Sequence, residues 1–404
     1  MTTVTDLELP VFDYYEDATL RGERYHETMR ELAERSWLAD SPLAYFVLDR
    51  EAATFFLRTK KATFPGMKIA ELFGVESGPL YEEMRRNILH INGADHARLR
   101  QLVNPSLTPR AADRWRPAMR GFIEELYDAV ADQGRCDFVA AFAKPYPSLT
   151  IANFMGAPLE DAPRLHEWSN WIQRQFDAPS LMTERERIEQ AVEEFYVYCA
   201  ELIEQRRNDP GDDLVSTLIE AEEDGDRLSD VECMNLVLNV LIGGVDTTQS
   251  QLAHAIRLLA DHPDQWELLG ERPELAGQAV EEALRFEPIT PFTARIMLED
   301  VEYRDVLFPE GTIVMVSAFN GNRDGVEEPN RFDIAADRGS VKPLTFGAGI
   351  HYCLGANLAR AELQEALAFL APRMPGLELD GEPEYGSVHG VYGLERLPVR
   401  WASS

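Results

Sequence analysis

The chain has 404 residues, of which 45% are hydrophobic and 27% are charged, a composition that supports a large folded core and excludes disorder and fibrous repeats. Its 70 acidic and 39 basic residues give a net charge of -31, which would repel nucleic acid and anionic membranes unless the cations gather on one face. An anionic ligand could therefore bind only where basic residues are concentrated locally. Length alone would allow two or three domains, at about 150 residues each.

Apolar residues recur with helical spacing along much of the chain, and strand-like runs are few. Helices are predicted over 18–36, 111–132, 183–208, 229–261, 272–286 and 356–372. Short strands are predicted over 42–48, 301–308, 311–317 and 397–401, the middle two joined as a hairpin through Pro309, Glu310 and Gly311. No repeat or low-complexity linker divides the chain. The predicted class is mainly α with a small β-sheet region to which both ends of the chain contribute.

The N-terminal residues lack the basic and apolar regions of an export signal, and no apolar stretch is long enough to span a bilayer. Four cysteines, at 136, 199, 233 and 353, form no CxxC pair. This pattern favours a reduced, cytoplasmic setting without membrane contact, and it disfavours a disulfide framework or a structural zinc site. The first three cysteines are interpreted as small buried side chains.

The predicted helix over 229–261 has an unusual centre. It is apolar almost throughout, yet Gly243 and Gly244 stand in its middle, where each costs about 1 kcal/mol relative to alanine. Asp246, Thr247 and Thr248 follow, and their side chains compete with the helical backbone for hydrogen bonds. Two interpretations remain open: a close helix crossing at the glycines, or a surface that admits a flat or bulky ligand beside an acid and an alcohol.

The second unusual segment spans 342–367. Gly347, Gly349 and Gly355 bracket His351 and Cys353, and an amphipathic helix follows directly. A cysteine at a helix N-terminus is favoured as a thiolate, and neighbouring amides can donate to its sulfur, as in metal-bound thiolates. A phosphate-binding glycine loop, a cysteine hydrolase and a tight turn around a buried cysteine are the alternatives.

The run FGAGIHYCLGA over 346–356 resembles the haem-binding loop of the cytochrome P-450 monooxygenases, in the form usual among soluble bacterial members. Segments 96–100, 243–248, 282–285 and 329–332 resemble four further motifs of the family in the expected order. The resemblance covers roughly residues 90–400. It implies a single triangular, helix-rich haem domain over 1–404, without a fused reductase.

The resemblance also implies roles for individual residues. Cys353 would be the axial ligand of the iron of haem b, and Asp246 and Thr247 the acid–alcohol pair that relays protons during cleavage of O2. Glu282, Arg285 and Arg331 would form a buried triad that holds the cysteine loop. Positions that would contact the cofactor, its propionates included, are His96, Arg100, Gly243, Gly244, Arg295, Phe346, Gly347, His351 and Gly355.

Electrons are expected from a separate ferredoxin and its reductase, so that NAD(P)H acts only indirectly, and the chain is expected to be a monomer. Six arginines and one acid between residues 96 and 120 leave a local charge of +5. This segment could steer an acidic ferredoxin. The candidate docking residues are Arg110, Arg114 and Arg116; alternatively, these arginines pair with acids elsewhere or bind propionates.

Family resemblance places the substrate wall at Phe73, Val240, Ile289, Phe292 and Val391, although core packing explains any one of them equally well. An apolar wall favours a hydrophobic small molecule, and hydroxylation with O2 is the expected reaction. The alternatives are a peroxide-driven or non-oxygenating haem-thiolate enzyme, or a haem protein without turnover.

Overall fold

The computed structural model describes the chain except for residues 1, 16, 18, 224–227, 340 and 403–404. The chain divides into two compact units. Unit 1 comprises Met1–Pro65, Glu281–Cys353 and Tyr385–Tyr392, and unit 2 comprises Gly66–Val280, Leu354–Glu384 and Gly393–Ser404. Two of the boundaries between the units fall inside an element. The boundary at residues 280 and 281 lies in α16 (Ala276–Phe286), and the boundary at residues 384 and 385 lies in β11 (Glu384–Tyr385).

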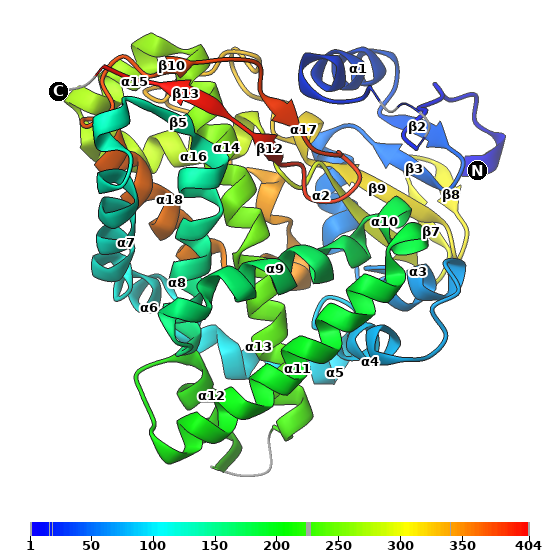
Figure 1. Cartoon of the computed structure of the whole chain (residues 1–404). Helices are drawn as coiled ribbons and strands as arrows, with labels where there is room; N and C mark the ends of the chain where they lie inside the picture. Colours follow the sequence, from blue (N-terminus) through cyan, green and yellow to red (C-terminus); the bar gives the residue numbers. More distant parts are fainter. Residues whose placement is uncertain (1, 16, 18, 224–227, 340, 403–404) are drawn as a thin grey trace. The chain divides into compact units, whose positions relative to one another are not determined.

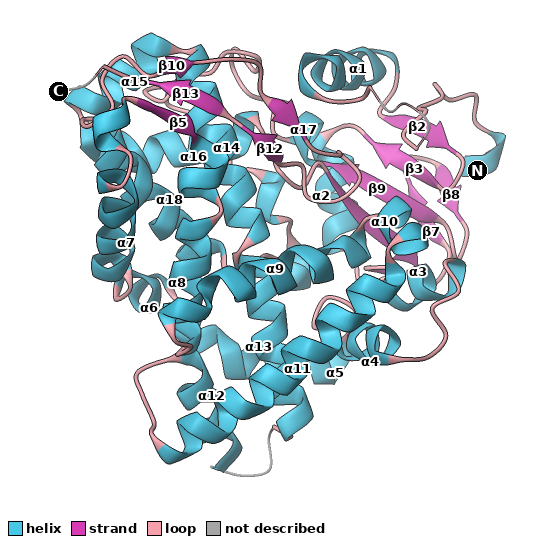
Figure 2. Ribbon diagram, viewed as in Figure 1, coloured by secondary structure: helices cyan, strands magenta, loops and turns pink. Residues whose placement is uncertain are grey.

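Unit 1 is built around a five-stranded sheet in the order β2-β3-β9-β6-β4 (Figure 2). Strands β3 and β9 run parallel, with Phe46 opposite Met315, and their buried apolar side chains join helix α2 in one core. The elements of unit 1 are β1 (Thr2–Thr3), α1 (Gly22–Arg35), β2 (Leu38–Ser41), β3 (Ala44–Val47), α2 (Arg50–Arg58), β4 (Ala62–Thr63), β6 (Phe292–Met297), β7 (Val301–Tyr303), β8 (Val306–Phe308), β9 (Ile313–Ser317) and α17 (Ala318–Gly321), with short 3-10 turns η1 (Val4–Asp6), η8 (Leu344–Phe346) and η9 (Gly349–His351).

Unit 2 is almost entirely helical. Its helices are α3 (Gly66–Leu72), α4 (Pro79–Arg86), α5 (Gly93–Val103), α6 (Pro109–Asp113), α7 (Arg116–Asp128), α8 (Pro145–Met155), α9 (Ala162–Gln173), α10 (Ala178–Thr183), α11 (Arg185–Asn208), α12 (Leu214–Glu223), α13 (Asp230–Gly244), α14 (Asp246–Asp261), α15 (Pro263–Glu271) and α18 (Ala356–Leu370). Short turns are η2 (Asn104–Leu107), η3 (Ala131–Gln133), η4 (Val139–Ala143), η5 (Leu159–Asp161), η6 (Arg174–Phe176) and η7 (Pro273–Leu275). A small sheet, β10 (Glu378–Leu379), β13 (Pro398–Arg400) and β5 (Arg135–Asp137), completes it with strand β12 (Leu394–Arg396).

The six predicted helices are confirmed over most of their lengths, apart from residue 18, which lies outside the described residues, and two of them are interrupted. The segment over 111–132 divides into α6 and α7, with Arg114 and Trp115 between them. The segment over 229–261 forms α13 and α14, which meet at Val245. A capping box starts α13, because the Ser229 side chain accepts from the Glu232 amide while the Glu232 carboxylate accepts from the Ser229 amide. The helices α9 and α11 pack against α13 within unit 2 (Figure 1).

Two strand predictions need correction. The predicted strand over 301–308 is itself a hairpin, since Val301 of β7 pairs with Phe308 of β8. Its turn is formed by Arg304 and Asp305, at φ 52° and 61°, a left-handed conformation that non-glycine residues seldom signal in sequence. The segment over 311–317 therefore does not pair with 301–308, and β9 joins β3 and β6 instead.

The ends of the chain do not share one sheet. Strand β3, predicted over 42–48, belongs to the five-stranded sheet of unit 1, whereas β13, predicted over 397–401, pairs with β5 and β10 in unit 2. The fold class, mainly α with small β-sheets, is confirmed. No described helix has the length and apolarity needed to cross a bilayer.

Candidate active site

The loop before Cys353 is held in a conformation that requires glycine. Gly349 adopts φ +76°, and a Cβ atom there would lie 2.5 Å from the carbonyl oxygen of Leu57 at the end of α2. The loop closes on itself where the Cys353 amide donates to the Phe346 carbonyl oxygen at 2.9 Å. Cys353 is partly exposed and precedes the first turn of α18, whereas Cys199 and Cys233 are buried. The glycines thus shape a fixed turn that presents one accessible cysteine.

Hydrogen bonds attach the start of this loop to the end of α16. The Asn322 amide nitrogen donates to Thr345 Oγ1 at 3.0 Å, and Asn322 Oδ1 accepts from the Leu344 amide at 2.5 Å. The Thr345 hydroxyl donates in turn to the carbonyl oxygen of Leu284 at 2.6 Å. Neither Asn322 nor Thr345 was predicted as a site residue; Thr345 lies directly before the glycine loop, whereas Asn322 lies far upstream and no local pattern links it to the loop.

Glu282 and Arg285 form the expected buried pair, with two contacts of 2.7 Å. The predicted third member, Arg331, is not part of it: its side chain is 59% exposed and bonds Glu328 at 3.0 Å. Arg338 takes that place, donating to both carboxylate oxygens of Glu282 at 2.8 and 3.2 Å. Arg331 contributes only its backbone carbonyl, which accepts from Arg285 at 3.0 Å. These donors outweigh burial and lower the pKa of Glu282, so the carboxylate stays ionised.

Arg295, on strand β6, is 3% exposed. Its guanidinium donates to the Ala294 carbonyl oxygen at 2.8 Å, and among the described residues no carboxylate forms an ion pair with it. Burial lowers its pKa to about 10. A buried cation without a counter-ion is unfavourable, and an anionic group of a cofactor would remove that penalty.

The two central glycines of the α13–α14 segment differ in their surroundings. A Cβ on Gly244 would lie 2.3 Å from Cδ1 of Ile151 on α8, so Gly244 serves a close helix crossing. A Cβ on Gly243 would have no heavy atom within 4 Å, and this glycine is exposed. The Thr247 hydroxyl donates to the Gly243 carbonyl oxygen at 2.5 Å, where the helix is interrupted. The close approach of a neighbouring helix is therefore observed at Gly244, whereas a ligand surface at Gly243 stays a prediction.

Asp246 is 5% exposed and faces α9. Its Oδ2 accepts from the Ser169 hydroxyl at 2.5 Å, and its Oδ1 accepts from the Asn170 amide at 3.4 Å. Burial raises the pKa of the carboxyl group despite these donors. Asp246 and Thr247 thus bond different partners. The motif predicted the acid and the alcohol, and it gave no indication of Ser169 or Asn170.

His96 and Arg100 lie one helical turn apart on α5 in unit 2. His96 is 4% exposed; burial and then the nearby Arg100 charge lower the pKa of its imidazole. In unit 1, the Phe346 ring meets Tyr352 edge to face at 6.4 Å, and His351 ends η9. Gly347 caps η8, and Gly355 caps the start of α18.

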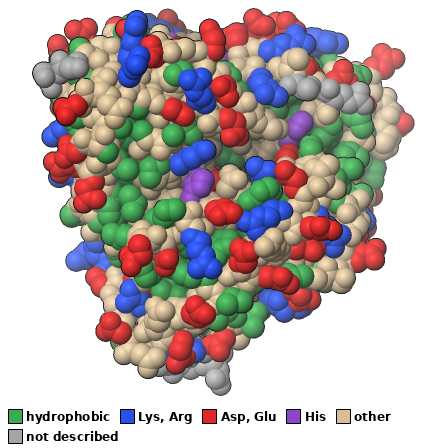
Figure 3. All heavy atoms as spheres, viewed as in Figure 1, with side chains coloured by type: hydrophobic (Ala, Val, Ile, Leu, Met, Phe, Trp, Pro, Cys, Tyr) green, Lys and Arg blue, Asp and Glu red, His purple; other side chains and the backbone are tan. Residues whose placement is uncertain are grey.

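Most arginines of the predicted docking segment are paired within unit 2. Arg114 bonds Asp212 at 3.0 Å, and Arg116 bonds Asp113 at 2.6 Å and Glu365 at 3.0 Å. Arg110 is exposed and forms no ion pair with any described residue. The side chains of Asp and Glu are spread over the face drawn in Figure 3 rather than gathered into one patch.

Of the predicted substrate-wall residues, Phe292 is a core residue of unit 1. It is 8% exposed and packs edge to face on Phe46 at 4.9 Å and on Tyr14 at 5.1 Å. Ile289 is also buried, whereas Phe73, Val240 and Val391 are partly exposed.

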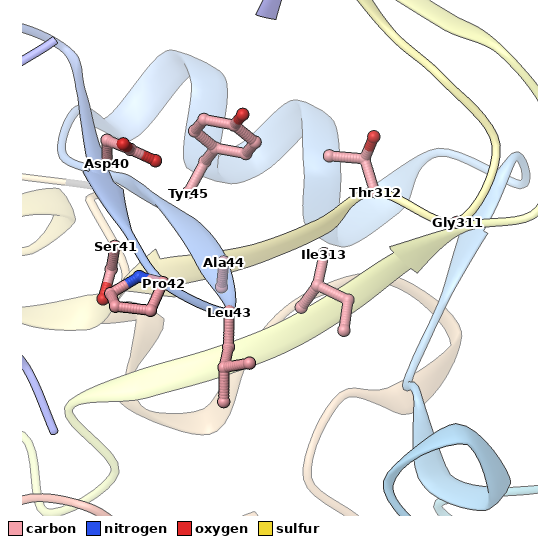
Figure 4. Close-up of a pocket in the computed structure, with 9 residues that line it drawn as sticks. All are labelled: Asp40, Ser41, Pro42, Leu43, Ala44, Tyr45, Gly311, Thr312 and Ile313. Atoms are coloured by element: carbon pink, nitrogen blue, oxygen red, sulfur yellow. The ribbon is translucent and has the colours of Figure 1, made fainter. Parts of the chain in front are cut away.

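A surface hollow of about 360 Å³ lies in unit 1 at the turn between β2 and β3 and at the start of β9 (Figure 4). Its walls are Asp40, Ser41, Pro42, Leu43, Ala44, Tyr45, Gly311, Thr312 and Ile313. None of the residues predicted from the motifs lines it.

Comparison with known proteins places this geometry in a family. The family model described as cytochrome P-450 matches residues 43–370. Luteothin monooxygenase of Streptomyces thioluteus is 38% identical over 93% of this chain and 92% of its own length. Mycinamicin IV hydroxylase/epoxidase of Micromonospora griseorubida is 39% identical over 79% of this chain and 81% of its own. The crystal structure of CalO2 superposes with a TM-score of 0.91 at 30% identity, covering 98% of this chain and 100% of CalO2.

Proposed function

The chain belongs to the cytochrome P-450 family, and from this premise we propose that it hydroxylates a hydrophobic small molecule at a haem b whose iron is ligated by Cys353. It is a monooxygenase that uses haem-thiolate iron and O2. We propose three finer assignments: the cofactor is haem b, the reaction is hydroxylation, and the electrons come from a separate ferredoxin and its NAD(P)H-dependent reductase. One haem domain over 1–404, the monomeric state and a cytoplasmic location stay predictions.

Arg295 is the observation that carries the cofactor assignment. A buried guanidinium that bonds only a backbone carbonyl, with no carboxylate partner among the described residues, lacks a counter-ion. A haem propionate has the charge and the hydrogen-bond acceptors that this group lacks. His351, which follows Gly347 and Gly349 in the same unit, is proposed as a second propionate contact, and the assignment of His96 and Arg100 on α5 to the propionates stays a prediction. The residues present therefore fit a haem.

A bound haem with a thiolate ligand activates O2 so that one oxygen atom can be inserted into a substrate. Cys353 supplies the ligand, just before the N-terminus of α18, where backbone amides and the helix dipole favour its thiolate form. Asn322 and Thr345 fix the loop to α16, so the sulfur is held in place before a substrate arrives.

Asp246 and Thr247 are proposed to deliver protons. The raised pKa of Asp246 makes its carboxyl group a proton carrier nearer neutral pH than an ordinary aspartate. In the resting arrangement Asp246 bonds Ser169 and Asn170, while Thr247 bonds the Gly243 carbonyl. No direct hydrogen bond between the Asp246 carboxyl group and the Thr247 hydroxyl is present among the described contacts, so we propose that the carboxyl group turns from Ser169 toward Thr247 when it delivers a proton.

The decisive experiment is the absorbance spectrum of the reduced, carbon monoxide-bound protein. Wild type is expected to show the far-red-shifted Soret band of a thiolate-ligated haem. Cys353→Ala is expected to lose that band, because the sulfur is removed, whereas the matched control Cys136→Ala, at another partly exposed cysteine, retains it. A band that persists in Cys353→Ala contradicts the proposed ligand.

A further inference from the structure

A cluster of buried polar side chains lies in unit 2 where α4, η6, α11 and α13 pack together. Its centre is Glu83 on α4, which is 0% exposed and accepts from the Asn87 side-chain amide at 2.6 Å. Gln175, in η6 and 1% exposed, also lies within hydrogen-bonding reach of the Glu83 carboxyl group. Asn239 of α13 accepts from the Ile88 amide at 2.8 Å, which joins α13 to the turn after α4.

Three atoms of this cluster are buried without a hydrogen-bond partner among the described residues: Glu83 Oε2, Gln175 Oε1 and Asn239 Nδ2. An unsatisfied buried polar atom costs about 1–3 kcal/mol, more when it is charged. Three of them come from three elements of one unit, and each would be stabilised by a hydrogen-bonding partner. The arrangement indicates a site that a polar guest completes.

The position of Asn239 connects the cluster to the chemistry of α13 and α14. Residues 239 and 243 are four positions apart within α13, so they lie on one stripe of the helix, and Thr247 follows beyond the interruption at Val245. The preceding positions Leu236, Val237 and Leu238 are buried, whereas Asn239, Val240 and Gly243 are partly or fully exposed. At 1.5 Å per residue, Asn239 lies about 6 Å from Gly243 along the axis of α13.

We propose that Glu83, Gln175 and Asn239 bind a hydrogen-bond-donating group of the substrate, a hydroxyl or a protonated amine, at a site about one helical turn along α13 from Gly243. The inference rests on the proposed monooxygenase function and deepens it. The substrate class becomes a mostly apolar molecule with one polar, donating end, and the cluster selects which carbon reaches the oxidising centre.

The chemistry of Glu83 favours a substrate group that donates a hydrogen bond over one that can only accept. Burial raises the pKa of its carboxyl group to about 7, against the opposing hydrogen bonds of Asn87 and Gln175. An arriving ammonium group would stabilise the carboxylate form, and a hydroxyl group would donate to it or to Gln175 Oε1. The side chain of Asn239 supplies the single donor, which suits the lone pair of a hydroxyl.

The test uses three probes of similar length: decan-1-ol, decylamine and decyl methyl ether, whose oxygen can only accept. Binding to the haem-loaded protein is followed by the spin-state shift of the Soret band and, independently of iron, by titration calorimetry. We expect the alcohol and the amine to bind about tenfold more tightly than the ether. Decylamine anchored at Glu83 moves the Soret band to shorter wavelength, whereas an amine that ligates iron moves it to longer wavelength.

Variants assign the preference to the cluster. Glu83→Gln keeps the side-chain shape and is expected to lose the preference for decylamine about tenfold while retaining part of the preference for decan-1-ol. Glu83→Leu is expected to lose both. Glu82→Gln, at the adjacent exposed position of α4, is the matched control and keeps wild-type affinities.

Equal affinity of wild type for all three probes, or an unchanged preference in Glu83→Gln, overturns the inference. A red-shifted Soret band with decylamine, in wild type and Glu83→Gln alike, does so as well. The proposed function has a separate readout. If the inference fails while the carbon monoxide spectrum shows thiolate-ligated haem, the monooxygenase stands; if that band is missing, calorimetry still reports whether the cluster binds donors.

Discussion

The cysteine-loop region of unit 1 and the α9–α13 region of unit 2 treat buried polar groups in opposite ways. Around the loop, Glu282 is bonded by Arg285, Arg338 and the Asp333 amide, and Asn322 satisfies both Thr345 and Leu344. In unit 2, Asp246 is held by one short and one long hydrogen bond, and Glu83 keeps one unpartnered oxygen among the described residues. A satisfied network fixes one geometry, whereas an incomplete one can accept a ligand or a proton. The first region suits the invariant task of holding a ligand, and the second suits selection and proton delivery.

The largest effects are expected where the satisfied network is broken. Arg285→Ala leaves the Glu282 carboxylate buried with fewer donors and should lower the free energy of unfolding by about 3–5 kcal/mol. Arg338→Ala should lower it by about 2 kcal/mol, because Arg285 remains. Arg331→Ala keeps the backbone carbonyl and should change it by less than about 0.5 kcal/mol. Urea unfolding measures the series; a larger effect of Arg331→Ala than of Arg338→Ala contradicts the assignment.

A smaller effect is expected from the pH dependence of unit 2. The pKa of Glu83 is about 7 in the folded chain and about 4.5 when unfolded, so the folded state binds more protons across that window. Stability from this group is therefore full below pH about 4.5 and is lost as pH rises through 7. Relative to wild type, Glu83→Gln should gain on the order of 3 kcal/mol between pH 4.5 and 8.

The reference for this measurement is Glu362→Gln on α18. The pKa of buried Glu362 is raised to about 8, so its contribution is lost at higher pH than that of Glu83. Thermal unfolding at several pH values yields both curves. If stability depends on pH in the same way in wild type and Glu83→Gln, then folding does not change the pKa of Glu83 and the prediction is wrong.

Loss of the acid from the Asp246–Thr247 pair is expected to lower turnover by about 10- to 100-fold. Asp246→Asn removes the acid and keeps the side-chain shape, with its oxygen accepting from Asn170 and its amide group donating to the Ser169 hydroxyl, so turnover with O2 and a reductase should fall to that extent. Turnover with hydrogen peroxide should be nearly unchanged, because peroxide already carries the protons. The milder Ser169→Ala should reduce turnover a fewfold. Equal losses with O2 and with peroxide would assign Asp246 a structural role only.

The smallest effect concerns electron delivery. Arg110, exposed and without an ion pair among the described residues, has a charge available to an acidic ferredoxin, whereas Arg114 and Arg116 are compensated by acids. Arg110→Glu should slow reduction by ferredoxin several-fold at low ionic strength, more than Arg114→Glu, and salt should erase the difference. Stopped-flow reduction rates provide the measurement, and equal rates at low salt would reject docking through Arg110.

Sequence patterns predicted the parts that depend on spacing. The helices, the glycine-bracketed Cys353 and the Glu282–Arg285 pair all follow from local periodicity or motif spacing. Contacts between distant segments were not predictable in this way. Arg338 rather than Arg331 reaches Glu282 because of a loop path that carries no periodic signal, and the β7–β8 turn uses two non-glycine residues at positive φ. The Glu83 cluster combines three separate segments, none of which is unusual alone.

The adjacent glycines at the end of α13 would respond differently to the same substitution by alanine, because the space around them differs. At Gly244 an added carbon would overlap the Ile151 side chain of α8, which would have to shift, so the cost would fall on the packing of the fold. At Gly243 the same carbon would enter open space, leave the fold intact and shorten the room beside Thr247. The space beside Thr247, proposed to face the reacting oxygen, can therefore be altered at Gly243 without changing the packing at Gly244.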